Sequence, residues 1–185
     1  MMTEISLNIL DVAENSVKAK ATLVTIKVEA VFGKNLLTVT IIDNGIGMSE
    51  EQVKRVIDPF YTTRTTRKVG LGVPFFKAAA EGTGGSFSIS SRPLVGTTVT
   101  ANFVLDSVDR MPLGDIGATI HTLVTMHEEM DFLFTYNVDG EEFSLDTREF
   151  REILGDISFK SPEVSLYIRD FLKENINAVN GEKII

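Results

Sequence analysis

Residues 41–48 read Ile-Ile-Asp-Asn-Gly-Ile-Gly-Met, and their first two residues complete the strongly apolar run 35–42, which predicts a strand. A carboxylate at the buried end of a strand, here that of Asp43, can accept hydrogen bonds from an exocyclic amino group such as that of adenine. Gly45 and Gly47 allow the backbone to approach a flat ligand closely, because they have no Cβ. The stretch therefore predicts a ligand site at the end of a strand.

The pair Asn44-Gly45 has a second interpretation, since Asn-Gly is a strong signal for a tight hairpin turn. A hairpin would need a second strand directly after the turn. Residues 49–57 instead have the pattern of a short helix, which Ser49 and Gln52 open as a capping box. The sequence thus favours a connection from a strand to a helix over a hairpin.

A predicted helix near the start of the chain has one polar face. Its apolar residues recur at helical spacing, at Ile5, Ile9, Val12, Ala13 and Val17. Spacings of four and three place Asp11, Asn15 and Lys18 together on the opposite face. The amide oxygen of Asn15 suits Mg²⁺, Lys18 can neutralise a phosphate, and Asp11 can orient or deprotonate a water molecule. A merely solvated helix face is the alternative.

Two further segments suit phosphate groups. Residues 58–68 contain three cations and four threonines without periodicity, which predicts a loop that covers phosphates, with a plain basic surface loop as the alternative. Gly70-Leu71-Gly72 opens a predicted helix over residues 72–81, where free backbone N–H groups and the helix dipole favour an anion. The chain contains no Walker-A sequence, so a P-loop fold is excluded.

The remaining pattern mixes strands and helices. Further strands are predicted at residues 23–32, 86–91, 97–105, 131–138 and 141–145. Asp139-Gly140 joins the last two as a hairpin. Further helices are predicted at residues 116–129, at 147–154 after a cap at Asp146, and from Ser161-Pro162 to about residue 177. The sequence therefore predicts an α+β fold.

Charge is unevenly distributed along the 185 residues, whose net charge is −8. Residues 1–105 hold 11 Lys and Arg against 9 Asp and Glu, whereas residues 106–185 hold 7 against 17. The change predicts a domain boundary near Asp106. An acidic second half is a poor reader of phosphate backbones, so we expect no nucleic-acid partner.

The composition excludes several kinds of chemistry. The chain has no cysteine and two histidines, which excludes disulfides, thiolate zinc sites, iron–sulfur clusters and cysteine nucleophiles. We predict half-buried packing for His121 and a solvated position for His127. The acids of the second half are predicted to form a solvated face, at Glu128, Glu129, Asp131, Glu141 and Glu142. The sequence shows no secretory signal or membrane span, and we expect a soluble, cytoplasmic protein without a membrane partner.

Taken together and in this order, the four segments resemble the GHKL superfamily, which includes DNA gyrase, heat-shock chaperone ATPases, histidine kinases and mismatch-repair ATPases. Residues 11–18 match its N box, 43–48 its G1 box, 58–64 its F box and 70–72 its G2 box. The segment from Gly84 to Thr98 also looks like the closing hairpin of the catalytic domain in histidine kinases. The sequence Pro-Phe-Tyr-Thr-Thr-Arg at residues 59–64, in the predicted phosphate-covering loop, also resembles the histidine-kinase branch of the superfamily.

The resemblance implies a two-layer α/β sandwich of the Bergerat type over residues 1–105, with a small acidic α+β extension at 106–185. It implies ATP and Mg²⁺ as cofactors, with Asn15 on the metal and Asp43 on the adenine amino group. Thr97 would join the adenine and water network. On the same matches, phosphates would meet Gly70, Gly72, Lys18 and Arg64, and the rest of the nucleotide would meet Gly45, Gly47, Met48, Phe60, Thr63, Lys68, Leu71 and Val73.

Some positions depart from the family pattern. Asp11 stands where the hydrolysing branches have Glu, and its shorter side chain reaches an attacking water less easily. Val73-Pro74 stands where Leu is common, and only a few residues precede the domain where kinases have their dimerising hairpin with the phospho-accepting His. We therefore expect transfer of the γ-phosphate to a partner protein in trans. The alternatives are an ATP-gated binding switch and a slow ATPase with Asp11 as the catalytic base.

Overall fold

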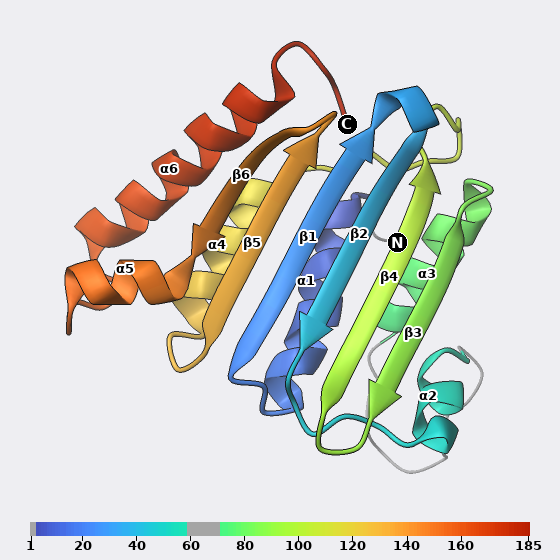
Figure 1. The fold of residues 1–185 in the computed structure, drawn as a ribbon, viewed down its shortest axis with the longest axis horizontal. Helices are drawn as coiled ribbons and strands as arrows, with labels where there is room; N and C mark the ends of the chain where they lie inside the picture. Colours follow the sequence, from blue (N-terminus) through green and yellow to red (C-terminus); the bar gives the residue numbers. More distant parts are fainter. Residues whose placement is uncertain (1–2, 59–70) are drawn as a thin grey trace.

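Apolar and polar residues alternate along the strands, and this period of two turns one face of a sheet toward the protein interior. The structure is a computed structural model that describes residues 3–58 and 71–185. Over these residues it contains a six-stranded sheet with the order β3-β4-β2-β1-β5-β6 (Figure 1). The strands are β1 (Leu23–Val31), β2 (Leu36–Asp43), β3 (Ser86–Arg92), β4 (Gly96–Val104), β5 (Asp131–Val138) and β6 (Glu141–Asp146).

Strand pairing in the sheet is antiparallel except at one place. Strands β1 and β5 run parallel, and every other neighbouring pair is antiparallel. In β2 the side chains of Leu37, Val39 and Ile41 are buried, whereas Thr38 and Thr40 point to the other face. The apolar face therefore needs a second layer of helices.

The longer helices supply this layer. They are α1 (Ile5–Lys18), α3 (Gly72–Gly82), α4 (Ile116–Met126) and α6 (Pro162–Asn180); the shorter helical segments are α2 (Glu50–Val56), α5 (Thr147–Leu154) and the 3-10 turn η1 (Phe32–Lys34). Helix α1 packs between α3 and α4, and α6 packs against α4, β5 and β6 (Figure 1). The predicted α+β fold with two layers is confirmed. None of the described helices is long and apolar enough to cross a membrane.

The second half of the chain extends the sheet of the first half. Strand β5 lies beside β1 with Val24 opposite Phe132 and Ile26 opposite Phe134. All four of these side chains are buried and belong to a single hydrophobic core that runs under both halves. The division at Asp106 stays a prediction.

Some boundaries differ from those predicted. The helix predicted over residues 116–129 ends at Met126, because the chain must turn to enter β5 at Asp131. The last helix continues to Asn180, where Gly181 with a positive φ ends it. The capping box of Ser49 and Gln52 is confirmed, with both hydrogen bonds formed at the start of α2.

The predictions of solvated positions for His127 and part of the acidic face are wrong. The His127 side chain is only 17% exposed, and its Nε2 lies 2.7 Å from Oε1 of Glu14 on α1. Glu128 accepts a hydrogen bond from Ser158 and Asp131 pairs with Arg151. These groups connect the start of β5 and the residues just before it to α1, α5 and the segment after α5, which sequence spacing alone does not indicate. His121 is half-buried and hydrogen-bonds Ser165, in line with its predicted packing role.

Candidate functional site

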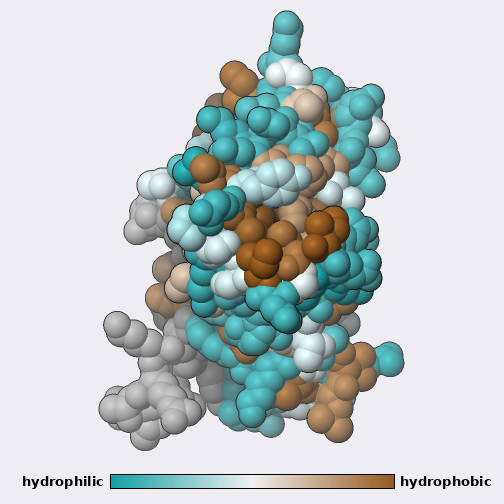
Figure 2. Space-filling model, turned by 90° about the vertical axis from the view of Figure 1, so that its left-hand side faces the viewer, coloured by the Kyte–Doolittle hydropathy of each residue, from teal (hydrophilic) through white to brown (hydrophobic). Residues whose placement is uncertain are grey.

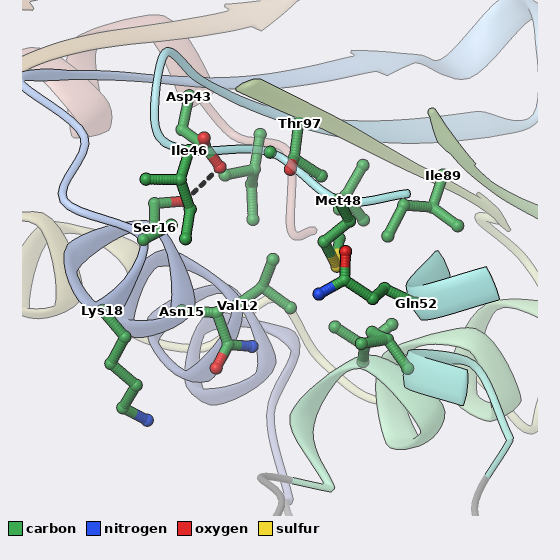
Figure 3. A pocket seen from close by; sticks show the side chains of 16 residues that line it. Val12, Asn15, Ser16, Lys18, Asp43, Ile46, Met48, Gln52, Ile89 and Thr97 are labelled. Carbon is green, nitrogen blue, oxygen red and sulfur yellow. Dashed lines mark hydrogen bonds between the residues drawn. The ribbon is translucent and has the colours of Figure 1, made fainter. Parts of the chain in front are cut away.

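A pocket of about 290 Å³ opens where β2 ends and β4 begins (Figure 3). Its walls come from α1, α2, α3 and the ends of β2, β3 and β4. The lining residues are Val12, Asn15, Ser16, Lys18, Ala19, Ile41, Asp43, Ile46, Gly47, Met48, Gln52, Val56, Val73, Ile89, Thr97 and Val99. Most of these side chains are apolar, so the few polar groups determine the orientation of a ligand.

Asp43, the last residue of β2, is 9% exposed and held by two donors. Its Oδ1 accepts a hydrogen bond from the backbone N–H of Gly45 at 2.9 Å, and its Oδ2 accepts one from Oγ of Ser16 on α1 at 2.8 Å (Figure 3). A carboxylate has about four acceptor sites, so further acceptor sites remain after these two bonds. The buried carboxylate is thus fixed in place and still able to accept a bond from an amino group.

Thr97 on β4 stands opposite Asp43 in the strand register. Its Oγ1 lies 2.9 Å from Oγ of Ser91, and that hydroxyl also accepts the backbone N–H of Met48 at 2.8 Å. The hydroxyl of Ser91 therefore joins the loop after β2 to the β3–β4 hairpin. Through this network the sheet itself positions Thr97 and Met48 beside the carboxylate.

The two glycines of the Asp43 loop are both required by close packing of the protein on itself. Gly47 has a φ of +64°, and a Cβ there would lie 1.9 Å from the backbone oxygen of Arg92. A Cβ on Gly45 would lie 2.7 Å from the backbone oxygen of Ala19, at the end of α1. Gly47 lines the pocket, whereas Gly45 does not and contributes through its N–H, which donates to Asp43.

Asn44 does not start a hairpin turn. Its side-chain oxygen accepts hydrogen bonds from the backbone N–H groups of Thr22 and Leu23, and the chain continues into α2.

The polar face of α1 leads from the carboxylate toward α3. Asn15 and Lys18 line the pocket on the side away from Asp43 (Figure 3). The side chain of Asn15 forms no hydrogen bond within the described residues, so its amide is available to a ligand. Asp11 lies against the first residue of α3, since a Cβ on Gly72 would be 2.8 Å from that of Asp11. A carboxylate, an amide and an ammonium group thus follow one another along one helix face.

The residues predicted to bind nucleotide fall into three groups. Seven of them line the pocket together: Asn15, Lys18, Asp43, Gly47, Met48, Val73 and Thr97. Four lie next to it, at Asp11, Gly45, Leu71 and Gly72; Leu71 precedes α3 and is exposed. Phe60, Thr63, Arg64, Lys68 and Gly70 lie outside the described residues. The proposed roles of all these residues remain predictions.

Sequence reasoning missed Ser16, Ser91 and Gln52. Ser16 is next to Asn15 and 3% exposed, and a helical projection would have placed it toward the apolar side. Ser91 is found only through the β3–β4 register. The sequence predicts Gln52 only as a cap residue, and in the structure it both caps α2 and lines the pocket. No signal in one sequence indicates which apolar residues, such as Ile46 and Ile89, form the walls.

No cluster of three or more His, Cys, Asp or Glu residues able to hold a metal occurs within residues 3–58 and 71–185. A metal ion at this pocket would therefore be bound by few protein ligands, together with a ligand's own oxygens and water. That is how Mg²⁺ is usually held beside phosphates. The free amide oxygen of Asn15 fits such an ion.

Comparison with known proteins gives a family and a fold. Residues 3–107 match the family described as "Histidine kinase-, DNA gyrase B-, and HSP90-like ATPase". Two rice proteins (Oryza sativa subsp. japonica), "Probable histidine kinase 4" and "Probable histidine kinase 6", are 36% and 38% identical over 87 and 74 residues, or 44% and 37% of this chain. The matches span 9% and 8% of those proteins.

A solved structure, the N-terminal domain of a DNA repair protein, has a TM-score of 0.59 at 15% identity. The likeness covers 98% of this chain and 58% of the other, and it concerns the fold alone. Because it covers nearly the whole chain, it includes β5, β6 and the helices that follow them.

Proposed function

This chain belongs to the family of histidine kinase-, DNA gyrase B- and HSP90-like ATPases, and its residues 3–107 form an ATP-binding domain of that type. We propose that the chain binds ATP together with Mg²⁺ and transfers the γ-phosphate to another protein. The observation that carries the proposal is the arrangement along the pocket. A fixed, buried acceptor at Asp43 stands at one end, and the polar face of α1 with Asn15 and Lys18 leads away from it. The order suits adenine at one end and phosphates at the other.

The groups at the phosphate end suit charge neutralisation. Asn15 would hold Mg²⁺ through its amide oxygen, and the ion, once bound, would neutralise the phosphate oxygens during transfer. Lys18 would act on the phosphates as a second cation. Glycine at position 72 leaves the start of α3, the end of a helix that favours anions, close to Asp11. Phosphoryl transfer depends mainly on such positioning and charge, so a nucleophile from another protein can complete the site.

In the proposed transfer, a side-chain nucleophile of the partner forms a bond to the γ-phosphorus, and the bond from that phosphorus to the β–γ bridging oxygen breaks. ADP leaves with that oxygen, and the proton of the nucleophile passes to water. The rice histidine kinases that match part of this domain support a kinase-like use of ATP.

One contact favours a second candidate, slow hydrolysis of ATP. The carboxylate of Asp11 lies at the start of α3, with its Oδ2 3.3 Å from a Cβ built on Gly72. A carboxylate there can take a proton from a water that attacks the γ-phosphate. Hydrolysis and transfer would use the same pocket and differ only in the nucleophile.

A single set of assays separates these functions. ADP production from Mg²⁺ and ATP is measured for the purified chain, for Asp11→Asn and for Asn15→Ala, with ATP binding followed by calorimetry. γ-Labelled ATP is then added with the proteins encoded beside its gene. We expect ATP binding, little ADP from the chain alone, and label on one partner that Asn15→Ala reduces at least about tenfold.

Other outcomes assign other functions. Turnover by the chain alone that disappears in Asp11→Asn, while that variant still binds ATP, supports the ATPase and contradicts a site that waits for a partner. If no protein takes label but the affinity for a partner differs between ATP and ADP, the proposed transfer is wrong and the chain is an ATP-gated binding switch.

A further inference from the structure

A groove lies between α5 and α6, at the edge of the molecule formed by β6. Its volume is about 470 Å³, and six of its eight lining residues are apolar or aromatic. They are Phe150, Ile153 and Leu154 on α5, and Val164, Tyr167 and Phe171 on α6. Figure 2, which faces this side of the molecule, shows hydrophobic side chains gathered around a hollow with hydrophilic ones around it.

The aromatic rings at the floor of the groove pack on one another. Phe150 packs edge-on against both Tyr167 and Phe171, with ring centroids 6.3 and 5.8 Å apart. Phe171 in turn packs on Phe143 of β6 at 5.4 Å. The floor is thus continuous with the core, and a groove of this kind exists before any partner binds.

The upper part of the groove is exposed to a degree unusual for apolar residues. Ile153 is 83% exposed and Tyr167 is 58% exposed. Single exposed apolar residues are ordinary, but several that surround one hollow mark a surface for a partner. An amphipathic tyrosine ring beside a preformed hollow is the kind of contact that contributes strongly to binding energy, and an exposed aliphatic residue next to it adds apolar area.

The charges at the rim of the groove are negative. The two charged residues that line it, Glu149 on α5 and Glu163 on α6, form no salt bridge among the described residues. The two arginines of α5 form their salt bridges elsewhere, Arg148 with Asp146 and Arg151 with Asp131, although the charge of Arg148 also acts on the neighbouring Glu149. The rim carboxylates are therefore available to cations from outside.

We propose that this groove binds a short amphipathic helix of another protein, with apolar anchors on one face and lysines or arginines beside them. The geometry fits such a helix. Helix α5 has eight residues, so one side of the groove is about 12 Å long, or about two helical turns. A helix laid between two helices places anchors at i, i+3 or i+4, and i+7 over that length. Its flanking cations would meet Glu149 and Glu163.

The same charges argue against two other occupants. A second copy of this chain would bring the same carboxylates to the contact, and like charges oppose the approach. An anionic membrane surface would be repelled for the same reason. The groove is also separate from the nucleotide pocket, because β1 and β5 lie between β2 and β6 in the sheet. Binding there does not rest on the proposed phosphate transfer.

The test uses the full chain and two synthetic peptides of about 14 residues made of leucine, alanine and a charged residue, labelled with a fluorophore. Both carry leucines at the anchor spacing; one has lysines and the other glutamates beside them. We expect the lysine peptide to bind, measured by fluorescence anisotropy, and the glutamate peptide to bind at least about tenfold more weakly. Added salt should weaken the binding of the lysine peptide.

Variants locate the binding on the chain. Ile153→Ser changes a residue that is 83% exposed, so the fold tolerates it, and it should weaken binding of the lysine peptide about tenfold. Val108→Ser changes a residue that is 98% exposed and lies outside the groove, and it should have no effect. The double variant Glu149→Lys, Glu163→Lys should remove the preference for lysine over glutamate.

Three results would overturn the proposal. The first is equal affinity for both peptides, and the second is an equal effect of Ile153→Ser and Val108→Ser. The third is occupation of the groove by another class of partner: a dimer in sedimentation that Ile153→Ser dissociates, or binding to phosphatidylglycerol vesicles that Ile153→Ser abolishes. Each of these readouts is independent of ATP, so failure here leaves the proposed phosphate transfer untouched.

Discussion

The proposed nucleotide pocket and the α5–α6 groove are both hollows with mostly apolar walls, yet they hold their carboxylates in opposite ways. In the pocket Asp43 is buried at the base and receives two hydrogen bonds from the protein. In the groove Glu149 and Glu163 lie with the lining residues and form no salt bridge among the described residues. A buried carboxylate that the protein already holds in place favours a small polar group of a ligand as its partner. Binding then costs no further conformational entropy for the carboxylate itself. Unpaired carboxylates at a rim attract any cation that flanks an apolar anchor.

The pocket and the groove both rest on the same hydrophobic core. The rings under the groove join the core through Phe143 and Phe134, and β5 carries that core to β1 in the middle of the sheet. A change in the shared core should therefore affect both sites. A change within one site should leave the other unaltered.

Phe134→Ala is expected to have the largest effect. Phe134 is fully buried on β5 opposite Ile26 of β1, and truncating such a ring costs about 3–5 kcal/mol of unfolding free energy. Guanidinium unfolding is followed by circular dichroism and, in parallel, by ATP binding. We expect both signals to change together at a lower midpoint, because sheet and core are continuous.

Ile153→Ala is the matched control. Because the side chain of Ile153 is exposed, this change should alter the free energy of unfolding by less than about 0.5 kcal/mol. Two separate transitions, with ATP binding retained after the first, would instead show that residues 106–185 unfold on their own. The predicted domain boundary near Asp106 would then stand.

Asp43→Asn should affect only the pocket. An amide keeps the bond from Gly45 and can donate to Ser16, so the fold is preserved, but the negative acceptor is lost. We expect calorimetry to show ATP binding about 100-fold weaker, or roughly 3 kcal/mol, as for hydrogen bonds to charged groups. GTP, with a carbonyl where adenine has its amino group, should bind the native chain weakly, and the variant should discriminate less between the two.

Asp109→Asn, on an exposed loop, controls for the loss of one charge. The affinity of the groove for the lysine peptide should be the same in the native chain, in Asp43→Asn and in Asp109→Asn. If ATP and GTP bind the native chain equally, Asp43 does not contact the base.

Sequence reasoning succeeded in the pocket where neighbours along the chain create the site. Asp11, Asn15 and Lys18 share a face because of helix geometry, and Asp43 ends an apolar strand; both statements need only local structure. Ser16 and Ser91 were missed because their partners come from strand register and helix packing over tens of residues. The assignments to Phe60, Thr63, Arg64, Lys68 and Gly70 remain predictions, since these residues lie outside the described part of the chain.

The groove was not predictable in the same way. The spacing of apolar residues in the second half predicts a small core between sheet and helix, made of Phe132, Phe134, Tyr136, Phe143, Leu145, Phe150 and Leu154. The first five are buried, whereas Phe150 and Leu154 are only half-buried. Whether Phe150 and Tyr167 are covered depends on how α5 and α6 diverge after the turn between them, and no short pattern determines that angle. The parallel pairing of β5 with β1 was equally out of reach, because it joins residues more than a hundred positions apart.

Tyr136→Phe gives the smallest expected effect and acts on the groove side of the comparison. Tyr136 is 1% exposed on β5, and its hydroxyl donates a 2.7 Å hydrogen bond to Asn180 at the end of α6. Burial raises the pKa of Tyr136 to about 12, against about 10 in an unfolded chain. The folded state therefore favours the neutral phenol. Below about pH 10 the neutral phenol makes its whole contribution to the free energy of unfolding, and this contribution is lost as the pH rises through about 12. Urea unfolding from about pH 8 to about pH 12 should show up to about 2 kcal/mol more loss for the native chain than for Tyr136→Phe. Tyr167→Phe is the matched control and should keep the native loss, because it retains Tyr136. An identical pH dependence in Tyr136→Phe and the native chain would mean that this phenol ionises without loosening α6, and that the groove wall is held by its apolar contacts alone.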